Sequence, residues 1–375
     1  MHRAAVVLVI EFTAALGWWW PAAAVAWDTD RLYGTPTRAR LTDVVVWRNR
    51  AYACWPRADA SQPVTLLELP WPETADGQAS SSWTPRRPFY ADQQKLYDCR
   101  RVQSAVAVDL DKFRGHLYVL DSGYDNCQPK IIVYDLKTYK CVRIYVIQSV
   151  ELGGLNGSRL ATLVVDARPF KGETRVYVGD ALGGRIAVLD PDRNIWYMIA
   201  LLHIQNYGSA VIQDYRRPEI YPDVPAECIA VSKLQSSVYL TSKRSHDLYT
   251  ASFKDLRNLT SYVTPNVKNG DVLPVGLRVR WEGVKLGVSS GLYADIQGGL
   301  NYVYTRDFVA VRLSLIAGAA PVAAEDHKVL LQSYDLLPAV TKIFSDNANY
   351  LQVWALNAVP NSKNRHLVKI NTLTL

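Results

Sequence analysis

The sequence lacks the short motifs that mark most metal, nucleotide and hydrolase sites. It has only five cysteines in 375 residues and no CxxC pair, so a structural zinc site is not expected. It also has no P-loop, no GxGxxG fingerprint, no GxSxG elbow and no HExxH pair. We therefore predict no metal and no cofactor. A two-carboxylate glycosidase stays open, although no acid pair is singled out.

Charged residues are also scarce, at 21%, and the net charge of +7 comes from scattered Lys and Arg rather than from a long basic run. A nucleic-acid footprint normally needs a clustered basic face, so no nucleic-acid partner is predicted. A mildly basic exterior suits adhesion to an anionic extracellular matrix.

Long apolar runs are confined to the first 26 residues, which begin with His2 and Arg3 and end in Ala24-Val25-Ala26. This pattern predicts a secretory signal peptide over residues 1–26, removed after Ala26, and a secreted protein without a membrane span. A spanning helix is the alternative, but Glu11 interrupts the run. Two N-glycosylation sequons, at Asn156 and Asn258, agree with export. An oxidising compartment would pair up to four of the five cysteines.

Aromatic and apolar residues are what the sequence has in abundance, with 22 Tyr, 11 Trp and a hydrophobic content of 49%. This composition favours strands. A strand pattern also repeats: residues 105–109, 117–121 and 131–135 read AVAVD, LYVLD and IIVYD. Related triplets start near the following residues: Asp43, Leu163, Ile229, Gly291 and Thr341.

The six copies predict an all-β fold, a six-bladed β-propeller with blades of about four antiparallel strands around a central channel. We expect a single domain over residues 27–375. Two β-sandwiches are the alternative, but a sandwich does not require repeats of constant period.

Ligands of a propeller usually meet residues at the starts of the innermost strands, which converge at one mouth of the channel. The channel candidates by position are Ser104, Thr162, Glu227, Ser289, Ser290 and Thr341. Glu227 could pair with a cationic amine, or simply cap a loop or meet an arginine. The hydroxyls could hold a catechol or an indole, or form turns. For the recurring Asp109, Asp166, Asp295 and Asp346 we favour hydrogen bonds to turn backbone over a metal array.

Three segments carry a resemblance to a known family. They are Asp98-Cys-Arg-Arg-Val-Gln-Ser104, Leu117-Tyr-Val-Leu-Asp-Ser-Gly123 and Cys127-Gln-Pro-Lys-Ile-Ile-Val-Tyr-Asp-Leu136. In order and spacing they resemble the signature segment of the yellow/major royal jelly protein family. Weaker matches reach Val353-Trp-Ala-Leu-Asn357, so the resemblance extends over most of the chain after residue 26.

The resemblance implies a secreted six-bladed propeller, with functions that differ between members. They include pigmentation and hardening of cuticle or eggshell, royal jelly nutrition, dopachrome conversion and capture of biogenic amines. The last blade helps line the amine pocket of amine-binding members, which makes Asn357 a further channel candidate. In this sequence the Ser-Asn-Arg that is usual in the family is replaced by Asn357-Ala358-Val359, which weakens the hypothesis that the protein binds biogenic amines.

The resemblance also implies a disulfide to Cys99, whose usual partner lies between the first two strands of its blade. Residues 109–116 contain no cysteine, so Cys141 is the predicted replacement, and Cys127 and Cys228 complete the set of candidates. The expected role is pigmentation or sclerotisation through binding of a catechol, an amine or a matrix protein. Dopachrome isomerisation is the enzymatic alternative, and serotonin or dopamine binding is the second alternative.

Overall fold

The structure is a computed structural model of the chain. It describes residues 27, 40–71, 94–147, 159–168, 173–182, 184–204, 224–262, 275–315, 322, 324–346, 350–359 and 366–372. The predicted signal peptide at 1–26 and the sequon at Asn156 lie outside the described residues.

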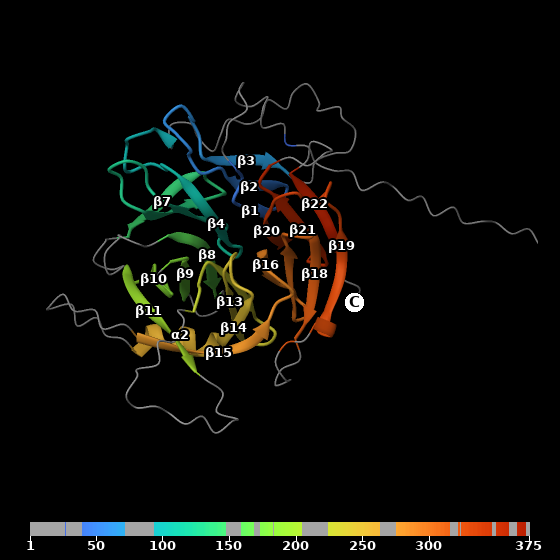
Figure 1. Ribbon diagram of the computed structural model, residues 1–375. Helices are drawn as coiled ribbons and strands as arrows, with labels where there is room; N and C mark the ends of the chain where they lie inside the picture. The colour runs from blue at the N-terminus through green and yellow to red at the C-terminus, as the bar shows by residue number, and fades with distance from the viewer. Residues whose placement is uncertain are drawn as a thin grey trace, which may run out of the picture.

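Strands dominate the described residues, and they fall into six antiparallel units of three or four strands each (Figure 1). The first three units contain β1 (Asp43–Trp47), β2 (Arg50–Cys54) and β3 (Leu66–Pro70); β4 (Ala105–Asp111), β5 (His116–Asp121), β6 (Lys130–Asp135) and β7 (Lys140–Val146); and β8 (Leu160–Ala167), β9 (Thr174–Asp180), β10 (Arg185–Asp190) and β11 (Ile195–Ile204).

The other three units complete the ring. They contain β12 (Cys228–Ser232), β13 (Ser237–Thr241), β14 (Asp247–Ser252) and β15 (Val275–Val284), with helix α2 (Phe253–Tyr262) before β15; β16 (Ser289–Ala294), β17 (Gly299–Tyr304), β18 (Val309–Ser314) and β19 (His327–Gln332), with the short helix η2 (Ala324–Asp326) before β19; and β20 (Val340–Ser345), β21 (Gln352–Asn357) and β22 (Leu367–Thr372).

The second unit shows why the sequence forms these hairpins. β4 and β5 pair from Ala105 opposite Asp121 to Asp111 opposite His116. At the turn, the Asp111 carboxylate accepts hydrogen bonds from the backbone N–H groups of the next residues, and Gly115 adopts φ +74°. Glycine reaches this left-handed conformation without a steric penalty, so the chain reverses tightly.

Six buried apolar clusters hold the units together, and each cluster lies between two successive units. The cluster that closes the ring joins Val44 and Trp71 of the first unit to Phe344 and Trp354 of the sixth. Burying one large apolar side chain is worth about 1.5–3 kcal/mol. Since neither face of a unit can be buried alone, the ring is stable only when it closes.

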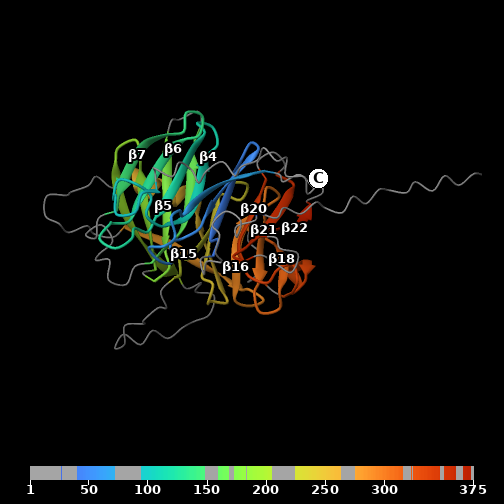
Figure 2. The same cartoon turned by 90° about the horizontal axis from the view of Figure 1, so that it is seen from above.

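The innermost strands β1, β4, β8, β12, β16 and β20 follow one another around a central axis, as Figure 1 shows face-on and Figure 2 from the side. The prediction of an all-β propeller is therefore confirmed. No helix among the described residues has the length and apolar character needed to cross a membrane.

One join departs from a simple ring of separate sheets. The outermost strands of the third and fourth units, β11 and β15, pair in parallel, with Ile199 opposite Val275 and Ile204 opposite Arg280. These two units thus form a single eight-stranded sheet. The sequence pattern gave no sign of this join, since it lies outside the repeated triplets.

Candidate functional site

The inner strands define a channel with two ends. We call the end at which they begin the inlet and the end at which they finish the outlet. A cavity of about 700 Å³ occupies the axis from the middle of these strands toward the outlet. It is lined by all six inner strands, through residues 44–46, 109–110, 163–167, 229–231, 292–295 and 342–345. This volume is typical of small-molecule sites.

Three lysines line this cavity: Lys112, Lys233 and Lys342. The turn after β4 places Lys112, the end of β12 places Lys233, and β20 itself carries Lys342. Tyr293 and Tyr350 add phenol rings to the lining. The Nζ of Lys112 lies 4.9 Å from the centre of the Tyr350 ring, a cation–π contact.

The carboxylates in the lining are committed to partners within the fold. Asp166 is bound by Arg257, and Asp295 by the Nε of Arg312 at 2.7 Å. Asp109 accepts hydrogen bonds from the backbone N–H of Val165 at 2.6 Å and of Leu110. Lys112 and Lys233 have no ion pair within the described residues. Asp166, Asp295 and Lys342 are each neutralised by an ion pair, so Lys112 and Lys233 leave the lining with one more positive charge than the carboxylate of Asp109 supplies in negative charge.

Burial changes the proton affinity of several of these groups. It raises the pKa of Asp109 and lowers that of Lys112. Burial also lowers the pKa of Lys342, but Asp43, at 3.0 Å, and Asp109 outweigh it, so the net pKa lies above the usual range. A carboxyl that holds its proton more tightly, beside an ammonium that holds its proton less tightly, is suited to proton exchange.

The residues predicted from the strand starts lie at the inlet, away from this cavity, and the structure does not bring them together around a common point. Three hydroxyls link neighbouring inner strands: Thr162 donates to the Glu227 carbonyl, Ser290 to the Val340 carbonyl and Thr341 to the Leu41 carbonyl. Each link ties one unit to the next, so these hydroxyls serve the architecture.

Three further predicted residues are also committed to contacts within the fold. The Glu227 carboxylate meets Arg159 at 2.6 Å and accepts the N–H of Lys243, which fits the loop-capping alternative. Ser104 accepts the backbone N–H of Arg57. Buried Asn357 lies on β21 and donates to the Leu336 carbonyl. A ligand role for the seven inlet candidates stays a prediction.

The seventh inlet candidate, Ser289, accepts a hydrogen bond from the buried Lys285, whose Nζ lies 2.6 Å from the serine Oγ. Burial lowers the pKa of Lys285 from 10.5 to about 8. Below about pH 8 the folded protein therefore holds a buried charge that the unfolded chain exposes to water. Because the unfolded state binds the proton more tightly, this group adds stability as the pH rises from about 8 to 10.5.

We expect Lys285→Met to remove this rise, which amounts to at most about 3 kcal/mol. Urea unfolding between pH 7 and about pH 10 should show that, above about pH 8, the free energy of unfolding of the wild type rises relative to that of the variant. Lys328→Met, an exposed site on β19, should keep the wild-type dependence. Parallel stability curves for wild type and Lys285→Met would contradict the assignment.

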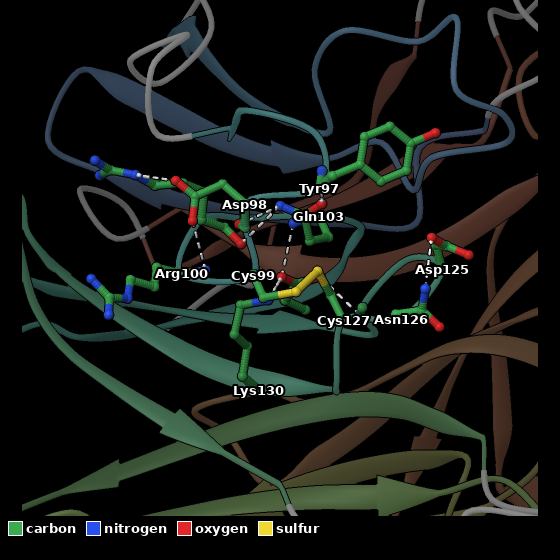
Figure 3. The surroundings of a disulfide bond; sticks show 12 residues. Tyr97, Asp98, Cys99, Arg100, Gln103, Asp125, Asn126, Cys127 and Lys130 are labelled. Atoms are coloured by element: carbon green, nitrogen blue, oxygen red, sulfur yellow. Dashed lines mark hydrogen bonds and ion pairs between the residues drawn. A yellow bond between two sulfur atoms is a disulfide. The ribbon is translucent and has the colours of Figure 1, made fainter.

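The disulfide differs from the predicted one. Cys99 pairs with Cys127, at a Cα–Cα distance of 5.1 Å, and not with Cys141 (Figure 3). Cys141 lies on the outer strand β7 and is exposed, so it does not reach the loop that carries Cys99. Cys228 is also a free thiol, as is Cys54, and both are buried. The prediction of up to two disulfides was therefore too high.

Asn258 lies in α2 and is half-buried, and its glycosylation stays a prediction. No group of three or more potential metal-ligating side chains occurs among the described residues.

Comparison with known proteins places this propeller in a class. Residues 103–284 match the family model described as Major royal jelly protein. Major royal jelly protein 3 of Apis mellifera is 35% identical over 96 residues, which cover 24% of this chain and 17% of that protein. This chain thus spans about a sixth of that relative's length. The family match includes the strands of the second unit and Cys127, and it begins four residues after Cys99, the other half of the disulfide.

The protein is thus a β-propeller that carries the royal jelly signature segment. Over residues 103–284 it is similar to the Major royal jelly protein family.

Solved structures with a similar fold are more distant in sequence. The β-propeller domain of Cps50 (Swd1) from Myceliophteria thermophila has a TM-score of 0.48 at 11% identity, with coverage of 89% of this chain and 83% of that chain. A luciferin-regenerating enzyme has a TM-score of 0.45 at 14% identity, with coverage of 85% and 84%. Virginiamycin B lyase from Staphylococcus aureus has a TM-score of 0.43 at 9% identity, with coverage of 90% and 86%.

Proposed function

We propose that this protein is a secreted yellow-type propeller that acts in pigmentation or sclerotisation of cuticle or eggshell, and that its outlet cavity holds a catechol-type molecule bearing a negative charge. Similarity to the Major royal jelly protein family supports the yellow-type role. The disulfide, which forms in oxidising compartments, supports secretion.

The observation that carries the ligand proposal is the charge of the cavity lining. Lys112 and Lys233 face the cavity without ion-pair partners in the described part of the chain, whereas its carboxylates are bound by arginines or by backbone N–H groups. A unit charge about 4 Å from an ammonium at a protein surface interacts by about 4 kcal/mol. This attracts an anion and repels a protonated amine, so the lining favours a carboxylate-bearing catechol or indole quinone over dopamine or serotonin.

Dopachrome conversion is the second candidate, and a specific pair of groups supports it. Tautomerisation of dopachrome moves a proton from carbon to a quinone oxygen, with no external oxidant or reductant, and needs one group to accept a proton and one to donate it. Asp109, with its raised pKa, and Lys112, with its lowered pKa, both line the cavity. Unaltered decay of dopachrome in the presence of the purified protein would exclude this candidate.

The ligand proposal is tested with three catechols of similar shape and different charge: 3,4-dihydroxyphenylacetate, 4-methylcatechol and dopamine. By calorimetry we expect the anion to bind most tightly and dopamine most weakly. Lys112→Gln/Lys233→Gln should weaken binding of the anion by about 10- to 100-fold, since two attractive charges are lost. Binding of neutral 4-methylcatechol should hardly change.

The matched control is Lys328→Gln, which removes one positive charge from the outer strand β19. It should leave all three affinities unchanged. Tightest binding of dopamine would contradict the proposal and favour the amine-binding alternative. The physiological role is tested by loss of the protein in the animal: unchanged colour, permeability and strength of cuticle and eggshell would contradict it.

A further inference from the structure

A second cationic group, Arg57, lies at the inlet and is neither exposed nor paired. The residue is only 7% exposed. Its Nε donates to the Gln103 carbonyl at 2.8 Å, but Nη1 and Nη2 are both buried and have no hydrogen-bond partner among the described residues. Two buried nitrogens of a guanidinium thus keep their N–H donors unused.

The neighbouring carboxylates do not satisfy these donors. Asp121 raises the pKa of Arg57 but is committed to the Lys130 ammonium at 2.6 Å and to the N–H of Ser104. Asp59 is engaged by Ser61 in its own exposed turn. Burial has the largest effect and lowers the pKa of Arg57. An unpaired buried charge costs several kcal/mol, so the site favours an anion that can meet the guanidinium.

Aromatic rings extend from Arg57 toward solvent. The ring of half-buried Tyr124 lies 6.0 Å from the Arg57 Cζ, and the ring of Tyr97 lies 6.4 Å from that of Tyr124. Tyr97 is 61% exposed and has φ +65°, a conformation that costs free energy in a bulky residue. Its backbone N–H donates to the Gln103 side chain at 2.9 Å, which helps to hold it there.

The covalent frame around these rings is rigid. The disulfide joins Cys99, two residues after Tyr97, to Cys127, three residues after Tyr124 (Figure 3). The backbone N–H of Arg57 donates to the Ser104 hydroxyl. The loops that carry the tyrosines and the guanidinium are therefore held in place, which reduces the entropy lost on binding, and a carboxylate reaches the buried Nη1 and Nη2 through a side-chain movement alone.

We propose that Arg57 binds the carboxylate of a small aromatic acid, whose ring packs against Tyr124 and Tyr97. A planar carboxylate matches the two free nitrogens of the guanidinium in a bidentate pair. A monoanion neutralises Arg57, whereas a dianion such as phosphate would add excess negative charge near Asp121 and Asp59. This inlet site is separate from the outlet cavity and does not rest on the proposed function.

The test uses calorimetry and thermal unfolding of the full protein with benzoate, 4-hydroxybenzoate, benzamide and inorganic phosphate. We expect both aromatic acids to bind and to raise the melting temperature, and neutral benzamide to do neither. Arg57→Gln should weaken benzoate binding at least tenfold. The affinity of Arg57→Lys should lie between those of the wild type and Arg57→Gln, because lysine keeps the charge but lacks the two parallel N–H donors of the guanidinium. Tyr97→Ser should weaken 4-hydroxybenzoate binding several-fold.

Because the outlet cavity is also expected to attract aromatic anions, binding at the inlet is measured in the Lys112→Gln/Lys233→Gln background. The matched control in that background is Lys328→Gln on the outer strand β19, which should leave benzoate binding unchanged. Loss of benzoate binding in that control, or equal binding with and without Arg57→Gln, would overturn the proposal. Binding of phosphate without binding of benzoate would also overturn it. If Arg57→Gln fails to fold, the comparison of benzoate with benzamide in the Lys112→Gln/Lys233→Gln protein decides, because equal affinities there would rule out a charge-based site at the inlet.

Discussion

Replacement of Asp121 by alanine is expected to lower the free energy of unfolding by about 4 kcal/mol, because it leaves a buried lysine without its counter-charge. The carboxylate is fully buried and lies 2.6 Å from the Nζ of Lys130, which is 1% exposed. It also accepts backbone hydrogen bonds from Gln103, Ser104 and Gly123. Denaturant unfolding followed by tryptophan fluorescence measures the loss.

The partner and a surface residue provide the comparisons for Asp121. Lys130→Met should cost less than Asp121→Ala, since the carboxylate keeps its backbone donors, and the double variant should cost less than the sum of the two. Asp98→Ala, which removes an exposed ion pair with Arg101, should cost about 0.5 kcal/mol. The prediction fails if Asp121→Ala costs no more than Asp98→Ala.

Removal of the disulfide is expected to have the next largest effect. Cys99 and Cys127 are 28 residues apart, and closing a loop of this length restricts the unfolded chain by about 3.5 kcal/mol. Cys99→Ala/Cys127→Ala should therefore lose about that much stability in urea unfolding. The same variant should weaken aromatic-acid binding at Arg57, since the two tyrosine-bearing loops are no longer joined.

Cys141→Ser serves as the control for the disulfide, because it changes an exposed free thiol on the outer strand β7. It should alter stability by less than about 0.5 kcal/mol. A loss for Cys141→Ser as large as that for the double variant would mean that Cys141 takes part in the bond after all.

The fold could be predicted from the sequence because the information is local and repeated. Short continuous runs of apolar residues that end in an aspartate, as in residues 117–121 and 131–135, specify a strand buried on both faces and then a turn. The aspartates that end the inner strands also have structural partners, as the sequence predicts: Asp109 accepts a backbone N–H of the next unit, and Asp295 is bound by Arg312. The parallel pairing of β11 and β15 depends on packing at the rim, where no repeat signals it.

The site was harder to predict because its residues meet only in the closed ring. Sequence position points to the strand starts as the ligand side, but in the structure the strand starts hold the links between units. The lysines of the cavity stand in or just after inner strands. Alignment of the repeats by their strand ends would have placed Lys112 and Lys233 beside one channel. Arg57 lies outside every strand, and nothing in its sequence context marks its buried, unpaired guanidinium.

The disulfide was mispredicted because the family pattern gave the spacing of a bond that this chain has lost. Cys141 belongs to the same unit, but it lies near the start of β7, at the outlet end, whereas Cys99 lies in a loop at the inlet. Cys127 follows the turn after β5, on the inlet side where Cys99 precedes β4. The two therefore meet although neither is in a strand.

The parallel join between β11 and β15 also bears on how the molecule responds to force and heat. The other five seams around the ring are held mainly by side chains packed between units, with single backbone hydrogen bonds such as that from Val322 to Glu282, but the seam between the third and fourth units has a ladder of backbone hydrogen bonds at the rim. These two units must then open together, with amide exchange in β11 and β15 slowed to the same extent. Under force we expect the ring to open as five bodies, one of double width, and to separate first at a seam that lacks this ladder.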